Sequence, residues 1–371
     1  MKRINKLLNE VKKLNIDAIL VLNKSNIFYL TGFKSIEGTL LYVTINGDVK
    51  LYVPPLEYER ALEETAGNVD VVPYSKVRVS WSIPRSIIVK PVEDVVVDNI
   101  KSIGGEVNVG IEYSIIPYVL AEKLKSKIEN LKVHDISKIL YKLRSIKDSE
   151  ELKLIKKAAR IAEEALDKCI ESVREGVSER EIAAKIEYLM KVLGAEEPAF
   201  STIVASGKNS SLPHARISSR KLRKRDIVVI DLGAKYEGYC SDMTRTISLG
   251  GLKGLEKEVY NVVFEAQREA IKHVKPGIKA ETIDSIARNV MKEYGYDKYY
   301  IHSTGHGVGI DVHEPPRIGQ GSDEILKPNM VFTIEPGIYI KGSIGVRIED
   351  LIVVTETGAK SITRFRKRLI V

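Results

Sequence analysis

A weak internal repeat is the feature of this sequence that most restricts its fold. A pattern that begins at Gly176 recurs at Gly277, 101 residues further along the chain. Both copies follow a long amphipathic segment and precede a strand-rich one, and two copies are too few for a solenoid. The matching positions are Gly176, Val177, Ile182, Met190, Lys191 and Gly194 in the first copy and Gly277, Ile278, Ile283, Met291, Lys292 and Gly295 in the second. The repeat predicts two similar α+β halves, packed about an approximate two-fold axis with a cleft where they meet.

An amphipathic segment before the first copy indicates where a second domain begins. From Asp148 onward, apolar residues recur at alternating intervals of three and four, which is the pattern of one buried helix face. Asp148 with Glu151 predicts a capping box for this helix, and Ser178 with Glu181 predicts one for the next. We therefore place the boundary between residues 140 and 148, and the second domain covers 148–371.

The first 140 residues alternate helical and extended patterns, as in an α/β domain built on a mixed sheet. Strands are expected at 18–22, 40–44, 49–53, 69–72 and 107–111, and helices up to residue 15 and around 118–128. This part has one histidine, His134, and no phosphate-binding glycine motif. We therefore interpret 1–140 as an N-terminal α/β domain and expect the chemistry in the second domain.

Two acidic residues in the first half of the repeat are predicted to face each other across a hairpin. The segments 226–233 and 239–249 have the pattern of strands, and a turn centred just after Tyr236 would place Asp231 opposite Asp242. Like charges in register destabilise a sheet, so a bound cation is the simplest compensation.

The second half has the same arrangement. The segments 331–339 and 346–354 flank a turn at Gly342, which places Glu335 opposite Glu349. One acidic pair could arise by chance. One pair in each half, beside apolar strand residues, indicates a metal site rather than solvated surface acids.

A glycine-rich segment between the acidic pairs holds three of the six histidines. His302, His306 and His313 lie within a stretch of twelve residues that also has three closely spaced glycines. The glycines do not form the dinucleotide motif Gly-x-Gly-x-x-Gly, and they would instead let the backbone approach a ligand closely. Three histidines in this setting indicate a metal ligand together with proton handlers or hydrogen-bond donors. His273 is instead interpreted as a favourable cation at a helix C-terminus.

Five segments of the second domain together resemble the pita-bread metallopeptidases, a family that includes prolidases, aminopeptidase P and methionine aminopeptidases. The segments are 230–233, 241–246, 302–314, 333–337 and 346–350. The resemblance implies a pita-bread catalytic domain with a pseudo-two-fold repeat. The N-terminal α/β domain is similar to that of the prolidase, aminopeptidase P and creatinase branch.

The resemblance also implies a dinuclear metal site. Its five ligands would be Asp231, Asp242, His306, Glu335 and Glu349, and all five positions match the family pattern. Four carboxylates and one imidazole make an oxygen-rich site that favours Mn²⁺ or Co²⁺, with Fe²⁺ and Zn²⁺ as alternatives. Two ions at such a site would produce a bridging hydroxide near neutral pH, which would attack the scissile carbonyl.

Other matching positions imply the rest of the chemistry. Glu335 is expected to shuttle the proton, while His302 and His313 stabilise the oxyanion and assist the leaving amine. His214 matches a further active-site histidine, and His214 and Arg317 match the pair that binds the terminal carboxylate in prolidase-type members, where His313 also contacts substrate. Two supporting positions that orient the site from behind are Arg347 and Tyr339.

These implied roles predict a metal-dependent Xaa-Pro dipeptidase. The nitrogen of a bond before proline carries no hydrogen, so a site that holds a dipeptide by its ends suits this substrate. Recognition of the terminal carboxylate would exclude longer peptides. The alternatives are an aminopeptidase P that acts on longer Xaa-Pro peptides, and an inactive binding protein or chaperone on the same fold.

Composition limits the partners and the location. A net charge of +8 is modest for 371 residues, and no nucleic-acid-binding motif accompanies the basic runs 220–225 and 364–368, so nucleic acid is not an expected partner. No apolar run has the length of a membrane span, and Cys169 and Cys240 cannot form a disulfide framework. We expect a cytoplasmic protein, and the resemblance implies a homodimer. Trp81 is interpreted as either a lid residue or an ordinary surface or packing residue.

Overall fold

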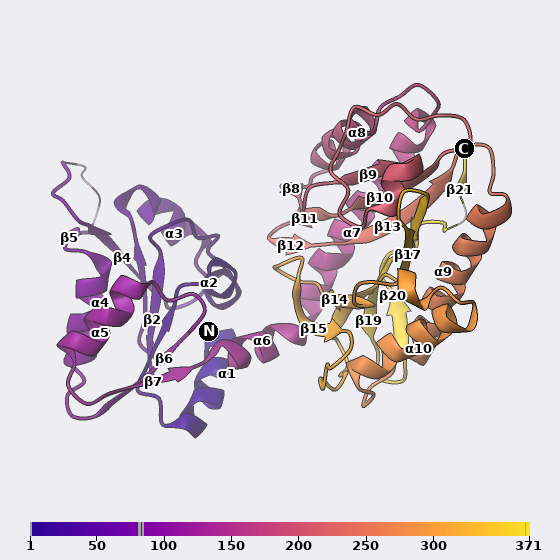
Figure 1. The fold of residues 1–371 in the computed structure, drawn as a ribbon. Helices are drawn as coiled ribbons and strands as arrows, with labels where there is room; N and C mark the ends of the chain where they lie inside the picture. The colour runs from indigo at the N-terminus through magenta and orange to yellow at the C-terminus, as the bar shows by residue number, and fades with distance from the viewer. Residues whose placement is uncertain (1, 81–82, 84, 368) are drawn as a thin grey trace. The chain divides into compact units, whose positions relative to one another are not determined.

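The computed structural model describes residues 2–80, 83, 85–367 and 369–371. The chain divides into two compact units, 1–144 and 145–371 (Figure 1). Trp81 lies outside the described residues. Among the described helices, none has the length and hydropathy that crossing a membrane would require.

The first unit is built on one mixed sheet, as predicted. The strand order is β5-β4-β3-β2-β1-β6-β7, and β1 pairs antiparallel with β2 but parallel with β6. The strands are β1 (Ala18–Val21), β2 (Leu40–Thr44), β3 (Val49–Val53), β4 (Asp70–Ser75), β5 (Ile88–Val89), β6 (Val107–Ile111) and β7 (Leu131–Asp135). Three of them, β2, β3 and β6, begin and end at the expected residues.

Helices of this unit pack against the sheet (Figure 1). Leu20 and Tyr52 point to one face, where they share a buried cluster with Val96 of α4 and Leu124 of α5. Alternate strand residues such as Ile19 point to the opposite face and are equally buried. The helices are α1 (Lys2–Val11), α2 (Lys24–Thr31), α3 (Tyr58–Glu64), α4 (Val92–Lys101), α5 (Tyr118–Lys127) and α6 (Ser137–Ser145). The short helices α2, α3, α4 and α6 were not predicted.

The second unit contains two similar α+β halves, as the repeat predicted. In the first half, helices α7 and α8 share one buried cluster with strands of the sheet β21-β13-β10-β9, through residues such as Ala162, Ile186 and Ile230. In the second half, α9 and α10 share another cluster with the sheet β15-β14-β16-β19-β20, through residues such as Val263 and Phe332. Each half therefore has its own helix pair, sheet and core.

The elements of the first half are α7 (Ser149–Cys169), α8 (Glu179–Val192), β8 (Glu197–Pro198), β9 (Ile203–Ser206), η4 (Gly207–Ser211), β10 (Ile227–Leu232), β11 (Ala234–Tyr236), β12 (Tyr239–Cys240) and β13 (Met243–Ser248). Those of the second half are α9 (Gly254–His273), α10 (Ala280–Glu293), η5 (Asp297–Tyr299), β14 (Gly305–Gly307), β15 (Glu314–Ile318), β16 (Val331–Ile334), β17 (Gly337–Ile340), β18 (Ile344–Arg347), β19 (Asp350–Val354) and β20 (Ala359–Ser361). The chain then returns to the first half, where β21 (Leu369–Ile370) pairs with β13.

The two halves meet where β18 passes η4. The Gly345 N–H donates to Ser210 Oγ over 2.8 Å, and the Gly342 N–H donates to Ser211 Oγ over 3.1 Å. A Cβ atom at residue 345 would lie 1.9 Å from the Ser210 carbonyl oxygen, so this approach requires glycine. The contact ties the loop after η4, which carries His214, to the second half.

Both predicted capping boxes are present. Asp148 accepts from the Glu151 N–H over 2.9 Å, and Ser178 Oγ accepts from the Glu181 N–H over 3.2 Å. In each case the glutamate carboxylate accepts the N–H of the capping residue in return. Cys169 is fully buried, as expected from its place on the apolar face of α7.

Replacing Ser178 with alanine is expected to lower the melting temperature of the protein by about 2–4 °C. Loss of a helix cap costs about 1 kcal/mol, and that change shifts the midpoint by this amount in a domain of this size. Thermal unfolding followed by circular dichroism measures the change. The control is Glu181→Gln, whose amide oxygen still accepts the Ser178 N–H. An unchanged midpoint in Ser178→Ala would contradict the contribution of the cap.

Candidate metal centre

The first acidic pair shares a sheet face, but in a register that differs from the predicted one. Asp231 of β10 lies opposite Thr244 of β13, and the turn is centred between Glu237 and Gly238. Both turn residues have positive φ, 45° and 82°, as a two-residue type I′ turn requires. The prediction that Asp231 lies directly opposite Asp242 was therefore wrong by two positions. Because strand side chains alternate with a period of two, this shift keeps both carboxylates on one face.

The second acidic pair lies in the predicted register. β16 pairs with β19 and β17 pairs with β18, and both ladders are centred on Gly342. Glu335 and Glu349 fall opposite each other at the interruption between these ladders. The Glu349 N–H donates to the Thr244 carbonyl oxygen over 3.1 Å, which brings the second pair beside the first hairpin.

Strand β14 places His306 beside the two acidic pairs. Its glycines permit close backbone packing, because a Cβ atom on Gly305 would lie 1.9 Å from the Thr333 carbonyl oxygen. A Cβ atom on Gly307 would lie 2.3 Å from the Pro315 carbonyl oxygen on the other side. These two glycines therefore permit a close approach to neighbouring strands, whereas the sequence predicted a close approach to a ligand.

Carboxylate oxygens of the two hairpins and a ring nitrogen of His306 in β14 lie close together. Ligand atoms of Asp242, His306 and Glu349 lie within 4.8 Å of one another. His306 Nε2 also lies 3.3 Å from Glu335 Oε1. Three buried carboxylate oxygens have no hydrogen-bond partner among the described residues, namely Asp231 Oδ1, Asp242 Oδ1 and Glu349 Oε1. Buried acceptors without donors are costly, and divalent cations would satisfy them.

The protonation of His306 also fits a cation. Its Nδ1 lies 3.2 Å from the Gly307 carbonyl oxygen, which can only accept, so Nδ1 carries the proton. Burial lowers the pKa of His306 to about 3, so Nε2 is unprotonated at neutral pH. Its lone pair then faces carboxylate oxygens of Glu335 and Asp242 at 3.3 and 3.6 Å. A cation between these atoms would convert repulsion into coordination.

Without metal, burial and mutual repulsion favour protonated carboxyl groups. Burial raises the pKa of Asp242 and Glu349 well above their ordinary values, and the neighbouring carboxylates raise it further. Burial raises the pKa of Glu335 to about 8. The charge of Asp231 contributes to all three increases. Divalent ions would supply the positive charge that allows Asp242, Glu335 and Glu349 to ionise together.

Arg347 links the two acidic pairs. It is 4% exposed and donates to Asp231 Oδ2 through Nη2. Its Nε donates to Thr244 Oγ1 over 3.0 Å, and that hydroxyl donates to Glu349 Oε2 over 2.7 Å. Its Nη1 donates to the Tyr339 hydroxyl over 2.9 Å. Thr244 was not among the predicted site residues, although its position two residues after Asp242 predicts that both point to one face.

His302 lies against Tyr339. Its Nδ1 lies 2.8 Å from the Ser303 carbonyl oxygen, and its Nε2 lies 3.1 Å from the Tyr339 hydroxyl. Burial lowers the pKa of His302 to about 4, so the imidazole is neutral at neutral pH. Because Nδ1 donates to a carbonyl oxygen, Nε2 accepts a hydrogen bond from the Tyr339 hydroxyl.

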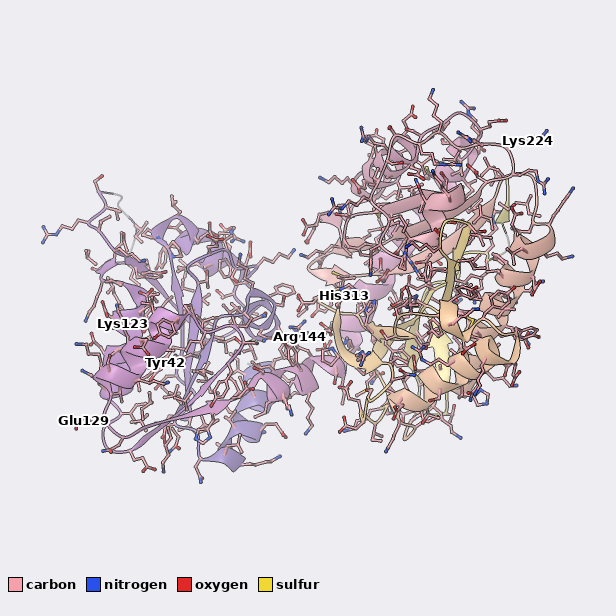
Figure 2. All side chains as sticks on the ribbon, viewed as in Figure 1. Tyr42, Lys123, Glu129, Arg144, Lys224 and His313 are labelled. Atoms are coloured by element: carbon pink, nitrogen blue, oxygen red, sulfur yellow. The ribbon has the colours of Figure 1, made fainter. Side chains whose placement is uncertain are left out.

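Three of the predicted site residues, His214, His313 and Arg317, are exposed. His313 is labelled in Figure 2. The ring centroid of His313 lies 4.1 Å from that of His306. Arg317 lies opposite His306 in the ladder of β14 and β15, so both side chains point to one sheet face. Partial desolvation lowers the pKa of His313, and the charge of nearby His214 contributes to the decrease. Arg317 Nη1 donates to the Gln320 carbonyl oxygen over 3.1 Å.

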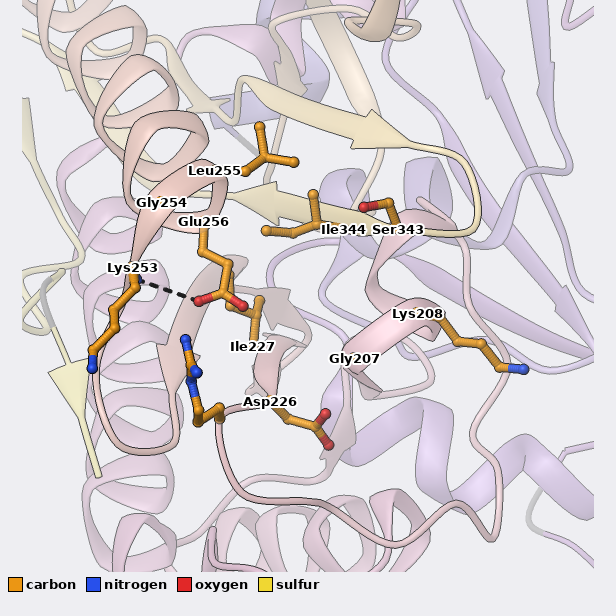
Figure 3. A pocket seen from close by; sticks show the side chains of 11 residues that line it. Gly207, Lys208, Asp226, Ile227, Lys253, Gly254, Leu255, Glu256, Ser343 and Ile344 are labelled. Carbon is orange, nitrogen blue, oxygen red and sulfur yellow. Dashed lines mark hydrogen bonds between the residues drawn. The ribbon is translucent and has the colours of Figure 1, made fainter.

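A cavity of about 440 Å³ lies elsewhere in this unit, at the start of α9 (Figure 3). Its lining contains none of the predicted site residues. Glu256 accepts from the Lys253 N–H over 3.4 Å, and Asp226 pairs with Arg220 at 2.5 Å. The acids of this cavity are thus used in local structure. Lys224 of the neighbouring basic run is exposed (Figure 2).

Two family profiles match this chain. Residues 153–356, more than half of the chain, match the profile of metallopeptidase family M24, and residues 3–146 match that of the creatinase/prolidase N-terminal domain. The Xaa-Pro dipeptidase of Pyrococcus horikoshii is 43% identical over 370 residues, which cover 100% of this chain and 99% of that protein.

Solved structures are similar over the whole length. The prolidase from Pyrococcus horikoshii has a TM-score of 0.88 at 42% identity, and the match covers 99% of each chain. The X-Pro aminopeptidase from Thermotoga maritima has a TM-score of 0.87 at 34% identity, and the match again covers 99% of each chain. The facing hairpins with their carboxylates and the two matching profiles lead to one conclusion: this chain belongs to metallopeptidase family M24 and carries a creatinase/prolidase N-terminal domain.

Proposed function

We propose that this protein is a metal-dependent Xaa-Pro dipeptidase, a prolidase that hydrolyses the bond before the proline of a dipeptide. The observation that carries the proposal is the convergence of three largely buried carboxylates, those of Asp242, Glu335 and Glu349, on one unprotonated imidazole nitrogen. The Asp231 carboxylate is tied to this group through Arg347. Two relatives, at 43% and 42% identity, are Xaa-Pro dipeptidases, which supports the substrate class. We assign catalysis to the domain 148–371, with 1–140 as its N-terminal partner domain.

The metal site would hold two divalent ions. The ligands would be Asp231, Asp242, His306, Glu335 and Glu349. Their oxygen-rich donor set favours Mn²⁺ or Co²⁺, with Fe²⁺ and Zn²⁺ as alternatives. When bound, such ions supply an acidic water molecule and a Lewis acid for the scissile carbonyl oxygen.

The side chains of the protein would move the protons and stabilise charge. With divalent ions bound, the Glu335 carboxyl group would be ionised, and it could then accept a proton from the attacking water and pass it to the proline nitrogen. His313 is exposed beside His306, and its neutral imidazole can donate an N–H to the oxyanion. His302, held by Tyr339, would assist at the leaving amine.

Arg317 and His214 would bind the terminal carboxylate of the dipeptide. Replacing Arg317 with alanine is expected to raise KM for Met-Pro by roughly 10–100-fold, because a hydrogen bond to a charged group contributes about 1.5–3 kcal/mol. We expect kcat to change much less, since the contact forms in both the bound state and the transition state. Steady-state kinetics measures both constants.

Two variants serve as controls for this prediction. Arg317→Lys retains the charge but loses the forked geometry, so its KM should lie between those of the wild type and Arg317→Ala. Lys224→Ala removes an exposed cation that is far from Arg317 in the sequence, and it should leave KM unchanged. A loss confined to kcat in Arg317→Ala would contradict the assignment.

The substrate class is tested by hydrolysis of Met-Pro, Ala-Pro and a tripeptide Xaa-Pro-Yaa, with and without added Mn²⁺ or Co²⁺. Metal-dependent cleavage confined to the dipeptides is the expected result. Cleavage of the tripeptide would support an aminopeptidase P instead, an alternative favoured by the likeness to the Thermotoga maritima X-Pro aminopeptidase. Absence of hydrolysis together with binding of nucleic acid or protein would support an inactive binding protein.

We further propose that the enzyme is a cytoplasmic homodimer. The cytoplasmic location is supported by Cys169 and Cys240, which are both buried free thiols, as suits a reducing compartment. Light scattering after size exclusion should give twice the chain mass of 41.5 kDa. A mass equal to one chain would contradict the dimer.

A further inference from the structure

We propose that Asp284 and Arg288 of α10 are positioning residues for the metal site. They act through the segment 300–304, which leads from α10 and η5 into β14. The inference rests on the proposed function in one respect, that His306 and Glu335 bind metal. It adds a buried carboxylate and a half-buried guanidinium that no sequence motif singled out.

The Asp284 carboxylate holds Thr304 by two hydrogen bonds. Asp284 is 0% exposed, and its Oδ1 accepts from the Thr304 N–H over 3.0 Å and from the Thr304 hydroxyl over 2.8 Å. Its Oδ2 accepts from Arg288 Nε over 2.6 Å. A buried carboxylate needs several donors, and these three fix the backbone of Thr304 relative to α10.

Arg288 holds the same segment at its other end. Its Nη1 donates to the Tyr300 carbonyl oxygen over 3.1 Å, and its Nη2 donates to the His302 carbonyl oxygen over 2.6 Å. The guanidinium carbon also lies 4.5 Å from the centroid of the Tyr300 ring. The Tyr300 hydroxyl lies 2.6 Å from Thr304 Oγ1 and donates to it, because the hydrogen of Thr304 is given to Asp284. The segment is therefore held at three points.

Thr304 is linked to two proposed metal ligands, Glu335 and His306. Its carbonyl oxygen accepts from the Glu335 N–H over 2.8 Å. His306 follows two residues later, and its N–H donates to Thr333 Oγ1 over 3.1 Å. That hydroxyl in turn donates to Glu335 Oε1 over 3.3 Å. A shift of Thr304 would displace the Glu335 backbone and the His306 ring together.

The first half of the repeat provides a matched control. Glu179 of α8 is also 0% exposed, and it accepts from the Ser206 N–H and hydroxyl, both over 2.7 Å. This carboxylate therefore makes the same pair of contacts as Asp284. Ser206 leads into η4 and the His214 loop, and not into a strand with a proposed metal ligand. Substitution of Glu179 controls for the general cost of losing a buried acid.

The test compares the Mn²⁺ affinity of variants by isothermal titration calorimetry on chelator-treated full-length protein. Asp284→Asn conserves volume, but its amide NH₂ must face either Arg288 Nε or the Thr304 N–H, and both are donors. The dissociation constant for Mn²⁺ is expected to rise roughly 10–100-fold. Glu179→Gln is expected to change it by less than about twofold, because distant sites act independently.

A second pair of variants keeps the test decisive where Asp284→Asn does not fold. Thr304→Val removes only the hydroxyl, whereas Thr304→Ser retains it. We expect Thr304→Val to weaken Mn²⁺ binding and to shift the visible absorption bands of the Co²⁺-loaded protein. Thr304→Ser should keep the wild-type Mn²⁺ affinity and the wild-type Co²⁺ spectrum. Unchanged Mn²⁺ affinity and Co²⁺ spectra in Asp284→Asn or in Thr304→Val, with only a lower melting temperature, would overturn the proposal.

Failure of this inference is distinguishable from failure of the proposed function. Mn²⁺ affinity is measured without substrate, so it does not depend on which peptide is cleaved. A wild-type protein that binds Mn²⁺ but does not hydrolyse Xaa-Pro dipeptides would contradict the proposed function alone. Weaker Mn²⁺ binding by Asp284→Asn in that protein would still support the positioning role.

Discussion

Replacing Asp242 with asparagine is expected to lower kcat/KM for Met-Pro by at least about a thousandfold, because metal ions contribute several kcal/mol to such reactions and about 1.4 kcal/mol corresponds to a factor of ten. The same change is expected to stabilise the metal-free protein at neutral pH. Burial raises the pKa of Asp242 well above its ordinary value, and Glu349 and Asp231 raise it further. An uncharged amide avoids the cost of either protonating or ionising a carboxyl group at this buried position.

Three measurements check this expectation. Dipeptide hydrolysis gives kcat/KM, elemental analysis gives the metal content, and calorimetry gives the melting temperature after chelation. The control is Glu356→Gln, which removes one negative charge from an exposed residue. Metal-dependent hydrolysis by Asp242→Asn at close to the wild-type rate would rule out Asp242 as a ligand.

The second large effect concerns pH. The metal-free protein is expected to lose stability as pH rises from 6.5 to 8, and the metal-loaded protein is not. Burial raises the pKa of Glu335 from 4.5 to about 8, so its contribution to stability is complete below pH 4.5 and is lost as pH rises toward 8. Asp242 and Glu349 act in the same direction.

The histidines do not obscure this effect. Burial lowers the pKa of His302 to about 4 and that of His306 to about 3, from an ordinary value of 6.5. Their contribution to stability is present above pH 6.5 and is lost only as pH falls toward those values. Between pH 6.5 and 8 the buried carboxyl groups therefore dominate the change.

The size of the effect follows from the proton that Glu335 retains in the folded state. One such proton contributes about 1.4 kcal/mol per pH unit, or about 2 kcal/mol over this window. The melting temperature of the metal-free protein should fall by about 4–8 °C. Scanning calorimetry on chelated and Mn²⁺-loaded samples measures the difference. A constant or rising melting temperature for the chelated protein would contradict the buried, unpaired state of these carboxyl groups.

Local signals in the sequence predicted much of the fold. The Ser178 capping box placed the start of α8, because a capping residue and the acid three positions later satisfy each other within one turn. Short runs rich in apolar and β-branched residues placed β2, β3 and β6. The first hairpin register was predicted wrongly, since the turn dipeptide is Glu237–Gly238 and not the pair one residue earlier. Positive φ at both positions favours glycine second, a signal present in the sequence.

The sequence by itself determined which acidic side chains share a face of each hairpin, because a strand alternates its side chains with a period of two wherever it lies. Only the tertiary structure decided their protonation and their support. The pKa of Glu335 depends on burial, and the link from Arg347 through Thr244 to Glu349 joins segments about a hundred residues apart. Asp284 reaches the site through Thr304, a contact that no local pattern encodes. Burial and long-range hydrogen bonds arise from packing between distant segments, which periodicity along one segment does not specify.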